Sequence, residues 1–189
     1  MTLRLGAAAL VWLWISACTA TAQHAGRTRG VMLDPLFSLQ SHNGTRFTRD
    51  DIKGRPFAVV FGFTHCPNVC PTTLVEMGQL LQELKEGADK IRVVFVTVDP
   101  ERDTVDALKN YLSSFDPRIV GLTGSIIDVT AATAAFNAFS EKVPSGNDYT
   151  IDHTLKVFFM DKYGLLAKEQ PSGASLKDNL ALVRKLLNQ

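Results

Sequence analysis

The sequence predicts an α/β domain in which helices cover a mostly parallel sheet. Two continuous apolar runs of strand length, 56–63 and 91–98, are typical of strands buried on both faces. A segment with apolar residues at three- and four-residue steps follows each run, as expected for a helix packed on a sheet. The end of the chain predicts a strand hairpin and a closing helix, so the sheet should finish with an antiparallel part.

Length and composition agree with one such domain. The chain has 189 residues, and single domains usually have about 100–200. It is 46% hydrophobic and 21% charged, which is close to the globular average and excludes disordered, collagen-like and coiled-coil classes. Twenty Lys and Arg against nineteen Asp and Glu leave a net charge of +1, so no overall field attracts nucleic acid. We expect no nucleic-acid partner.

Residues 1–22 are typical of an export signal. The uncharged apolar stretch Leu5–Ala17 is short for a spanning helix, which needs roughly 20 residues, and suits a signal-peptide core. Ile15–Cys18 resembles a bacterial lipoprotein box, which would place a lipid on Cys18, whereas Ala20–Ala22 offers ordinary cleavage, which would remove it. An uncleaved short anchor is a third possibility. Each predicts an exported bacterial protein, at the periplasmic face of the inner membrane or soluble in the periplasm, where thiols meet oxidising conditions.

A tether and a hairpin come next. Residues 23–36 are expected to form the tether, and 37–189 the folded domain. Short strand-like segments at 37–39 and 45–47 flank Asn43-Gly44, a pair that favours a type I′ turn, so an N-terminal hairpin is predicted.

The remaining elements follow in order. Beyond the strand at 56–63, apolar spacing predicts a helix from Thr72 to Gly87, and the strand at 91–98 ends at Asp99-Pro100. Asp103 is placed to cap the next helix. The patterns then predict a short strand at 119–122, an Ala-rich helix at 129–139, a hairpin from strands 156–160 and 165–168, and an amphipathic helix at 176–187.

Cys66 and Cys70 stand where the first buried strand passes into its helix. One helical turn brings two thiols four residues apart onto one face, where they can form a disulfide or bind one ion. A helix N-terminus lowers the pKa of a thiol and favours the thiolate, the reactive and metal-binding form. Zinc usually takes four ligands, often from two such pairs, whereas two thiolates and one imidazole suit copper.

Four histidines are candidates for the imidazole. His24 in the tether and His42 in the first turn are expected to be ordinary surface residues. His65 directly precedes Cys66, and neighbours in an extended segment point to opposite faces, so its ring should face away from the thiol. His153 precedes a predicted strand, and spacing alone leaves it as either a loop residue or a ligand.

Three motifs in order resemble the Sco/SenC family of copper proteins: FGFTHCPNVCPTTL at 61–74, VTVDPERDT at 96–104 and DYTIDHT at 148–154. The resemblance covers nearly all of the chain from about Phe37. It implies a thioredoxin-like fold with an N-terminal hairpin and a central mixed sheet flanked by helices. It also implies that Cys66, Cys70 and His153 bind copper, as Cu(I) or Cu(II), with His153 at or near the place of the usual cis-proline.

Some positions around these motifs leave roles open. Asn68 and Phe63 stand where many relatives have Asp and Tyr. The loop Asp99–Asp103 is expected near the site, or alternatively supplies a helix cap and surface ion pairs. Asp152 either orients His153 or is an exposed turn residue.

By resemblance, the chain is expected to be a membrane-associated copper metallochaperone. It would receive copper from an upstream donor and deliver it to the dinuclear centre of cytochrome c oxidase subunit II. An alternative from the enzyme class is an exported thiol-disulfide oxidoreductase that reduces the copper-binding cysteines of the acceptor through the same pair, Cys66 and Cys70. A peroxidase is disfavoured because Thr64-His65-Cys66 lacks the Pro-x-x-x-Thr-x-x-Cys arrangement.

Overall fold

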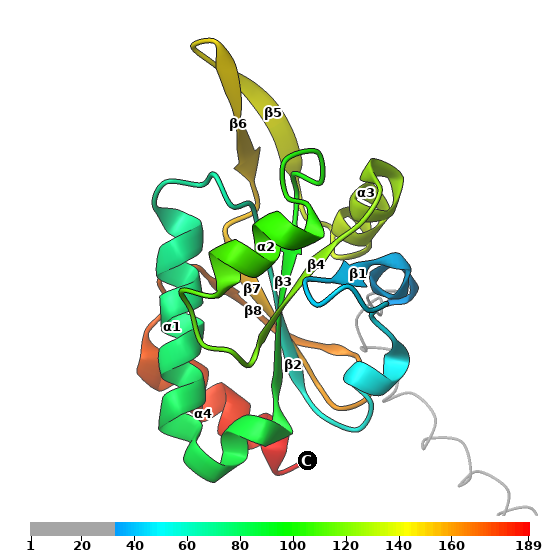
Figure 1. Ribbon diagram of the computed structural model, residues 1–189. Coiled ribbons are helices and arrows are strands. Elements are labelled where there is room, and N and C mark those ends of the chain that lie inside the picture. The colour runs from blue at the N-terminus through cyan, green and yellow to red at the C-terminus, as the bar shows by residue number, and fades with distance from the viewer. Residues whose placement is uncertain (1–32) are drawn as a thin grey trace, which may run out of the picture.

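A six-stranded mixed sheet lies at the centre of the computed structural model, which describes residues 33–189 (Figure 1). Its strand order is β1-β4-β3-β2-β7-β8. The strands are β1 (Gln40–Ser41), β2 (Phe57–Gly62), β3 (Arg92–Thr97), β4 (Ile119–Thr123), β7 (Lys156–Met160) and β8 (Leu166–Pro171). The pairs β2–β3 and β3–β4 are parallel, whereas β1, β7 and β8 join antiparallel. This confirms the predicted α/β class with a central mixed sheet.

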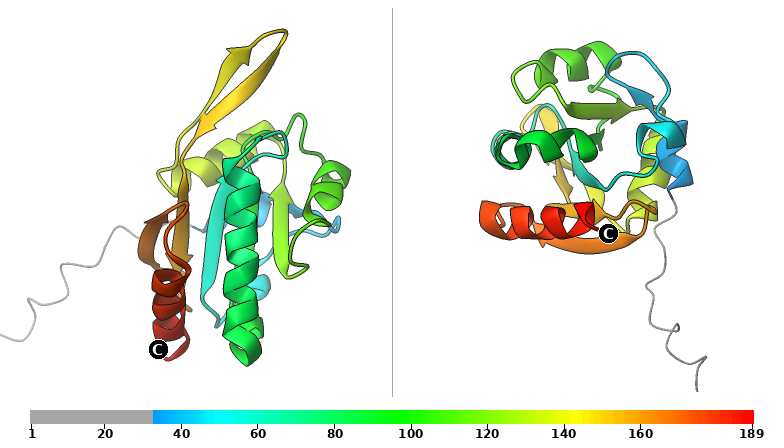
Figure 2. Two further views of the ribbon diagram at one scale, coloured as in Figure 1. Left: turned by 90° about the vertical axis from the view of Figure 1, so that its left-hand side faces the viewer. Right: turned by 90° about the horizontal axis from the view of Figure 1, so that it is seen from below.

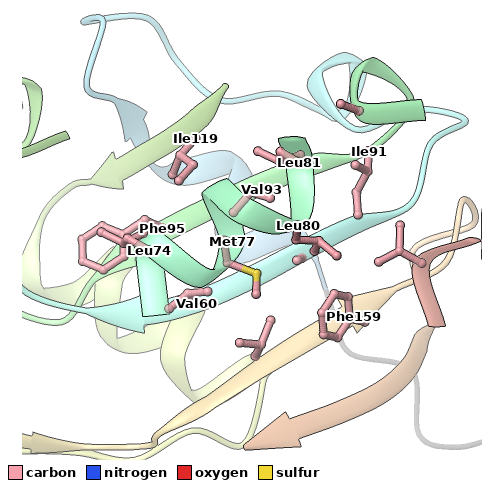
Figure 3. Close-up of a cluster of buried hydrophobic side chains, with 14 of the residues drawn as sticks. Val60, Leu74, Met77, Leu80, Leu81, Ile91, Val93, Phe95, Ile119 and Phe159 are labelled. Carbon is pink, nitrogen blue, oxygen red and sulfur yellow. The ribbon is translucent and has the colours of Figure 1, made fainter. Parts of the chain in front are cut away.

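Both faces of β2 are buried, as the continuous apolar run predicted. Ala58 and Val60 pack into one core cluster and Val59 and Phe61 into the other, because successive strand residues point to opposite faces. Figure 3 shows the first cluster, where Leu74, Met77, Leu80 and Leu81 lie over strand residues that include Val60, Val93 and Phe159. The strand is thereby fixed on both sides up to the point where the cysteine loop begins.

Helices cover both faces of the sheet (Figure 2). The first core cluster holds buried residues of α1 (Val69–Leu84), α2 (Val105–Leu112) and α4 (Leu176–Leu187). The second holds those of α3 (Ile126–Ala135) and of the 3₁₀ helix Asp34–Ser38. The bounds of α4 equal the predicted ones, whereas α1 and α3 each begin three residues earlier than predicted.

The N-terminal hairpin is present in a reduced form, and its turn differs from the expected type I′. The amide of Gly44 donates to the carbonyl of Ser41, and Gly44 has φ of 81°, whereas Asn43 is not among the positive-φ residues of the described chain. A type I turn followed by one left-handed glycine explains this pattern. Only Gln40 and Arg46 form a bridge across it, since β1 pairs with β4 instead.

A second hairpin, absent from the sequence prediction, projects from the top of the molecule (Figures 1 and 2). It consists of β5 (Ser140–Ser145) and β6 (Asp148–His153), which pair only with each other in a two-stranded sheet. All of β5 is exposed, so its sequence lacks the apolar alternation that marks a half-buried strand. The one local indication of this hairpin in the sequence is the turn residue Gly146, which has φ of 62° in the structure.

The predicted export signal 1–22 and most of the tether lie outside the described residues. Within residues 33–189, no helix has the length and apolar character required to cross a membrane.

Candidate metal centre

Two thiols and one imidazole meet at the carboxyl ends of the parallel strands. Cys66 lies in the loop after β2, Cys70 in the first turn of α1, and His153 at the last position of β6. One potential ligand atom from each lies within 4.8 Å of the other two. The structure therefore brings together the three residues that the resemblance implied.

The start of α1 places the two sulfur atoms. The amide of Cys70 donates a hydrogen bond to Sγ of Cys66 across 3.4 Å, while the N-cap residue Asn68 makes no side-chain cap. The first amides of a helix have no partner within the helix, so the Cys66 sulfur satisfies one of them. The same unpaired amides favour a negative charge on that sulfur.

His153 approaches the pair from the last position of β6. Its Nε2 lies 3.5 Å from Sγ of Cys70, and its Nδ1 lies 3.2 Å from the carbonyl oxygen of Thr154. Because a carbonyl oxygen can only accept, Nδ1–H donates to Thr154 and orients the ring, which leaves Nε2 facing the thiols. Asp152, left open as an orienting residue, is exposed, and the Thr154 carbonyl performs that task.

Neighbouring side chains shape the space around these atoms. The ring of Phe63 meets the His153 ring edge to face, with centroids 5.8 Å apart. A Cβ at Gly62 would lie 2.7 Å from Sγ of Cys70, so this position leaves room for the sulfur. The sequence analysis did not single out Gly62, although a glycine that ends an apolar strand often marks such a close approach.

Cys66 and Cys70 differ in burial and in the pKa of their thiols. The hydrogen bond from the Cys70 side chain, assisted by His153 and by the amides of Cys70 and Asn68, lowers the pKa of Cys66 despite its partial burial. The shared hydrogen bond with Cys66, together with burial, raises the pKa of Cys70. Cys70 is 2% exposed and His153 7%, whereas Cys66 is half-buried. Cys66 is therefore the thiolate that a partner can reach.

The loop Asp99–Asp103 does lie at the site. Glu101 forms an exposed ion pair with Lys142, as the alternative expected, whereas the predicted helix cap at Asp103 is wrong. Asp103 is fully buried and accepts hydrogen bonds from the Thr64 amide (3.0 Å), the Thr64 hydroxyl (2.6 Å) and the Thr97 hydroxyl (2.6 Å). The cap of α2 is Thr104, whose hydroxyl accepts from the Ala107 amide. Asp103 thus ties the start of the cysteine loop to the end of β3.

The other histidines stay away from the thiols. His65 is exposed, its Nδ1 lies 3.0 Å from the Thr64 hydroxyl, and it is not part of the ligand group, in agreement with a ring that faces away from the thiol. His42 is not the plain surface residue that was expected, because its Nδ1 accepts from the Gly121 amide and burial lowers its pKa. His24 lies outside the described residues.

Two soft sulfur ligands and one imidazole suit copper, and three donors match the trigonal shell of Cu(I). A structural zinc site would want a fourth protein ligand, and within residues 33–189 the group holds three. The donor set therefore fits copper better than zinc.

Comparison with known proteins places the chain in a family. The SCO1/SenC family model matches residues 26–188. An SCO2-like protein of Rickettsia prowazekii is 33% identical, over 97% of this chain and 93% of its own length. The structure of Bradyrhizobium japonicum ScoI with copper bound is 38% identical and covers 79% of this chain and 96% of its own, with a TM-score of 0.74.

A third comparison is a SCO1/SenC family lipoprotein from Bacillus anthracis, 26% identical over 79% of this chain and 92% of its own, with a TM-score of 0.71. These neighbours share the thioredoxin-like fold that the resemblance implied. The family model spans nearly the whole chain, and the protein is a member of the SCO1/SenC family.

Proposed function

We propose that the protein binds one copper ion through Cys66, Cys70 and His153 and delivers it to the dinuclear copper centre of cytochrome c oxidase subunit II. The observation that carries the binding step is the convergence of two sulfurs and one imidazole nitrogen within 4.8 Å. A relative with 38% identity whose structure has copper bound supports the choice of metal. Family membership supports a role in the assembly of the oxidase.

Differences in burial suggest the order of ligand exchange. Cys70 and His153 are buried, whereas Cys66 is half-buried at the mouth of the site. A thiolate of the acceptor can therefore form its bond to copper on the Cys66 side as the bond to Cys66 breaks. Cys70 and His153 then hold the ion until further acceptor ligands replace them. This sequence keeps the ion coordinated by at least three atoms throughout.

The binding step is tested by anaerobic copper titration of the reduced protein, with His153→Ala and His65→Ala compared. His65 is exposed and outside the ligand group, so His65→Ala should bind one equivalent like the unchanged protein. His153→Ala should bind more weakly and lose histidine coordination. Equal binding by the two variants would remove His153 from the site.

Delivery is tested by mixing the copper-loaded protein with the reduced, metal-free copper domain of subunit II and following the spectrum of the acceptor. Transfer should occur with the unchanged protein and fail with Cys66→Ser. Transfer that persists without Cys66 would contradict the proposed order.

A thiol-disulfide oxidoreductase is the second candidate, favoured by the asymmetry of the two thiols. The lowered pKa of Cys66 makes it the attacking thiolate, and the raised pKa of Cys70 keeps the second thiol protonated. Cys66 would attack a disulfide of the acceptor and form a mixed disulfide. Cys70 would then release the acceptor dithiol, so two electrons pass to the acceptor and a Cys66–Cys70 disulfide remains.

His153→Ala separates the two functions, because disulfide exchange does not require the imidazole. Loss of copper binding with retained reduction of the acceptor would show two separable roles. Retention of both would show that neither function needs His153, which would contradict the three-ligand copper site and favour the redox role of the cysteine pair.

Export to the periplasmic side of the membrane is part of the same proposal. Residues 1–22 would act as the export signal, 23–36 as the tether and 37–189 as the copper-binding domain, with a lipid on Cys18 or cleavage after Ala22. The likeness to a Bacillus anthracis lipoprotein supports the lipid anchor. An intact mass of the mature protein from its native host distinguishes the two, since lipidation retains Cys18 and adds acyl mass.

A further inference from the structure

Arg102 occupies a confined position between the projecting hairpin and the metal centre. Its guanidinium carbon lies 3.8 Å from the centre of the Tyr149 ring and 5.9 Å from that of Phe63. Its Nη1 donates to the carbonyl oxygen of Tyr149 across 3.1 Å, and its Nε donates to the fully buried carboxylate of Asp99. Arg102 thus contacts β6 four residues before His153.

Tyr149, Arg102 and Phe63 form a continuous series of contacts that ends at His153. The hydroxyl of Tyr149 donates to the other oxygen of Asp99 across 2.9 Å, so Tyr149 is bonded to the loop through both its ring and its hydroxyl. Phe63, which faces Arg102, packs its ring against His153 with centroids 5.8 Å apart. The stack therefore runs from Tyr149 through Arg102 and Phe63 to the imidazole.

We propose that Arg102 is a positioning residue for the metal centre: clamped to Asp99, it fixes β6 through Tyr149 and thereby sets His153 against Cys70. This inference rests on the proposed copper site. It assigns the loop Asp99–Asp103 a task at that site, which is to hold the distant ligand rather than to bind the ion.

The hairpin needs such a clamp because its own pairing does not fix it to the domain. β5 and β6 pair only with each other, and a two-stranded hairpin is marginally stable by itself in water. β5 is exposed along its whole length, and β6 buries only Ile151 and His153. Tyr149 attaches β6 to the loop near the hairpin turn through Arg102 and Asp99, and the exposed Lys142–Glu101 pair attaches β5 to the same loop.

The chemistry of the clamp favours arginine over lysine. A guanidinium is planar, stacks on an aromatic ring and donates in several fixed directions at once, whereas an ammonium is a compact point charge. Asp99 and Asp148 balance the charge of Arg102. We therefore expect Arg102 to act through geometry, so that a lysine with the same charge does not replace it.

The experiment compares Arg102→Lys with Arg118→Lys as a matched control. Arg118 forms a similar pair with Asp116 and lies next to Ile119, at the end of β4 remote from the site. Tyr149→Leu and Tyr149→Phe form a second pair, because phenylalanine keeps the ring under Arg102 and leucine removes it. Both pairs are also made in the His153→Ala background.

Two measurements are made on each variant. Hydrogen exchange of the metal-free protein should show faster exchange across 140–153 in Arg102→Lys and Tyr149→Leu, and unchanged exchange there in Arg118→Lys. Tyr149→Phe keeps the ring under Arg102 but loses the hydrogen bond to Asp99, so its exchange should lie between these two groups. Copper affinity should fall about tenfold in the first two variants, the scale typical of residues that orient a ligand. In the His153→Ala background the same changes should alter the affinity less than about twofold, because the ligand that they position is gone.

Three results would overturn the inference. The first is unchanged exchange of the hairpin in Arg102→Lys and Tyr149→Leu. The second is an equal loss of affinity with and without His153, which would show that Arg102 acts through the cysteine pair. The third is a matching loss in Arg118→Lys. If the unchanged protein bound no copper, the proposed function would fail, while hydrogen exchange would still decide whether Arg102 fixes β6.

Discussion

The Nε2 atom of His153 lies 3.5 Å from Sγ of Cys70, although 83 positions separate the two residues. Cys70 is held by the first turn of α1 and His153 by the last position of β6. The metal centre therefore joins two parts of the fold, and a change in the position of either part should alter the distance between the ligands.

Replacing His153 should weaken copper binding by more than the loss of an orienting residue does. Changes to orienting residues commonly cost about 10- to 100-fold in metal affinity, so loss of the ligand itself should cost at least about 100-fold. Competition with a Cu(I) chelator measures this in His153→Ala. His65→Ala is the control, since its side chain is exposed. A change of less than tenfold in His153→Ala would contradict the three-ligand site.

Gly62→Ala should both destabilise the fold and displace the Cys70 sulfur. The added Cβ would lie 2.7 Å from that sulfur and 2.6 Å from Cε2 of Phe95. Overpacking of this kind costs about 1–3 kcal/mol in the free energy of unfolding.

Gly78→Ala is the matched control, because its Cβ would meet nothing closer than 3.4 Å and alanine favours the helix. It should leave stability unchanged or raise it by up to about 1 kcal/mol. Denaturant unfolding measures the free energy of unfolding of both variants. Equal values would show that the site around Gly62 accommodates a Cβ without strain.

Alkylation of Cys66 in the reduced, metal-free protein should stay fast below neutral pH. The pKa of Cys66 is lowered to about 3, mainly by the hydrogen bond from Cys70, so the thiolate persists on acidification. An ordinary thiol, with a pKa near 8.5, loses reactivity about tenfold for each pH unit below that value. Iodoacetamide labelling from pH 8 to pH 5, read by peptide mass, should give a nearly constant rate for Cys66.

The same experiment contains its control. Cys70 is buried and its pKa is raised, so it should label slowly in the folded protein and at an ordinary rate after unfolding in guanidinium. A tenfold loss of Cys66 labelling per pH unit would refute the lowered pKa.

Asp103→Ala should destabilise the protein strongly, since it removes the acceptor of three hydrogen bonds. A buried donor left without its charged acceptor costs about 1–3 kcal/mol, so the total should reach about 3 kcal/mol. Asp106→Ala, in the exposed first turn of α2, should cost no more than about 1 kcal/mol through the helix dipole. Thermal or denaturant unfolding distinguishes the two, and a similar small loss for both would contradict the role assigned to Asp103.

The sequence by itself determined the elements that bury apolar side chains. The strands at 57–62 and 92–97 and the helix at 176–187 were predicted because burial imposes a local period that the residues display. The spacing of Cys66 and Cys70 also predicted that the two residues lie close together, because residues one helical turn apart share a face. Local rules could place these residues because the interactions concerned are local.

Tertiary structure decided the rest. The hairpin 140–153 has an exposed strand and no apolar period, so the turn residue Gly146 was its one local signal. Asp103 looked like a helix cap, and became a buried acceptor because the loop after β2 lies beside the end of β3. His153 entered as a ligand through family resemblance, and the fold brings it to Cys70 through contacts between distant segments. Such contacts depend on which strands become neighbours and on what clamps them, and these relations have no period along the chain.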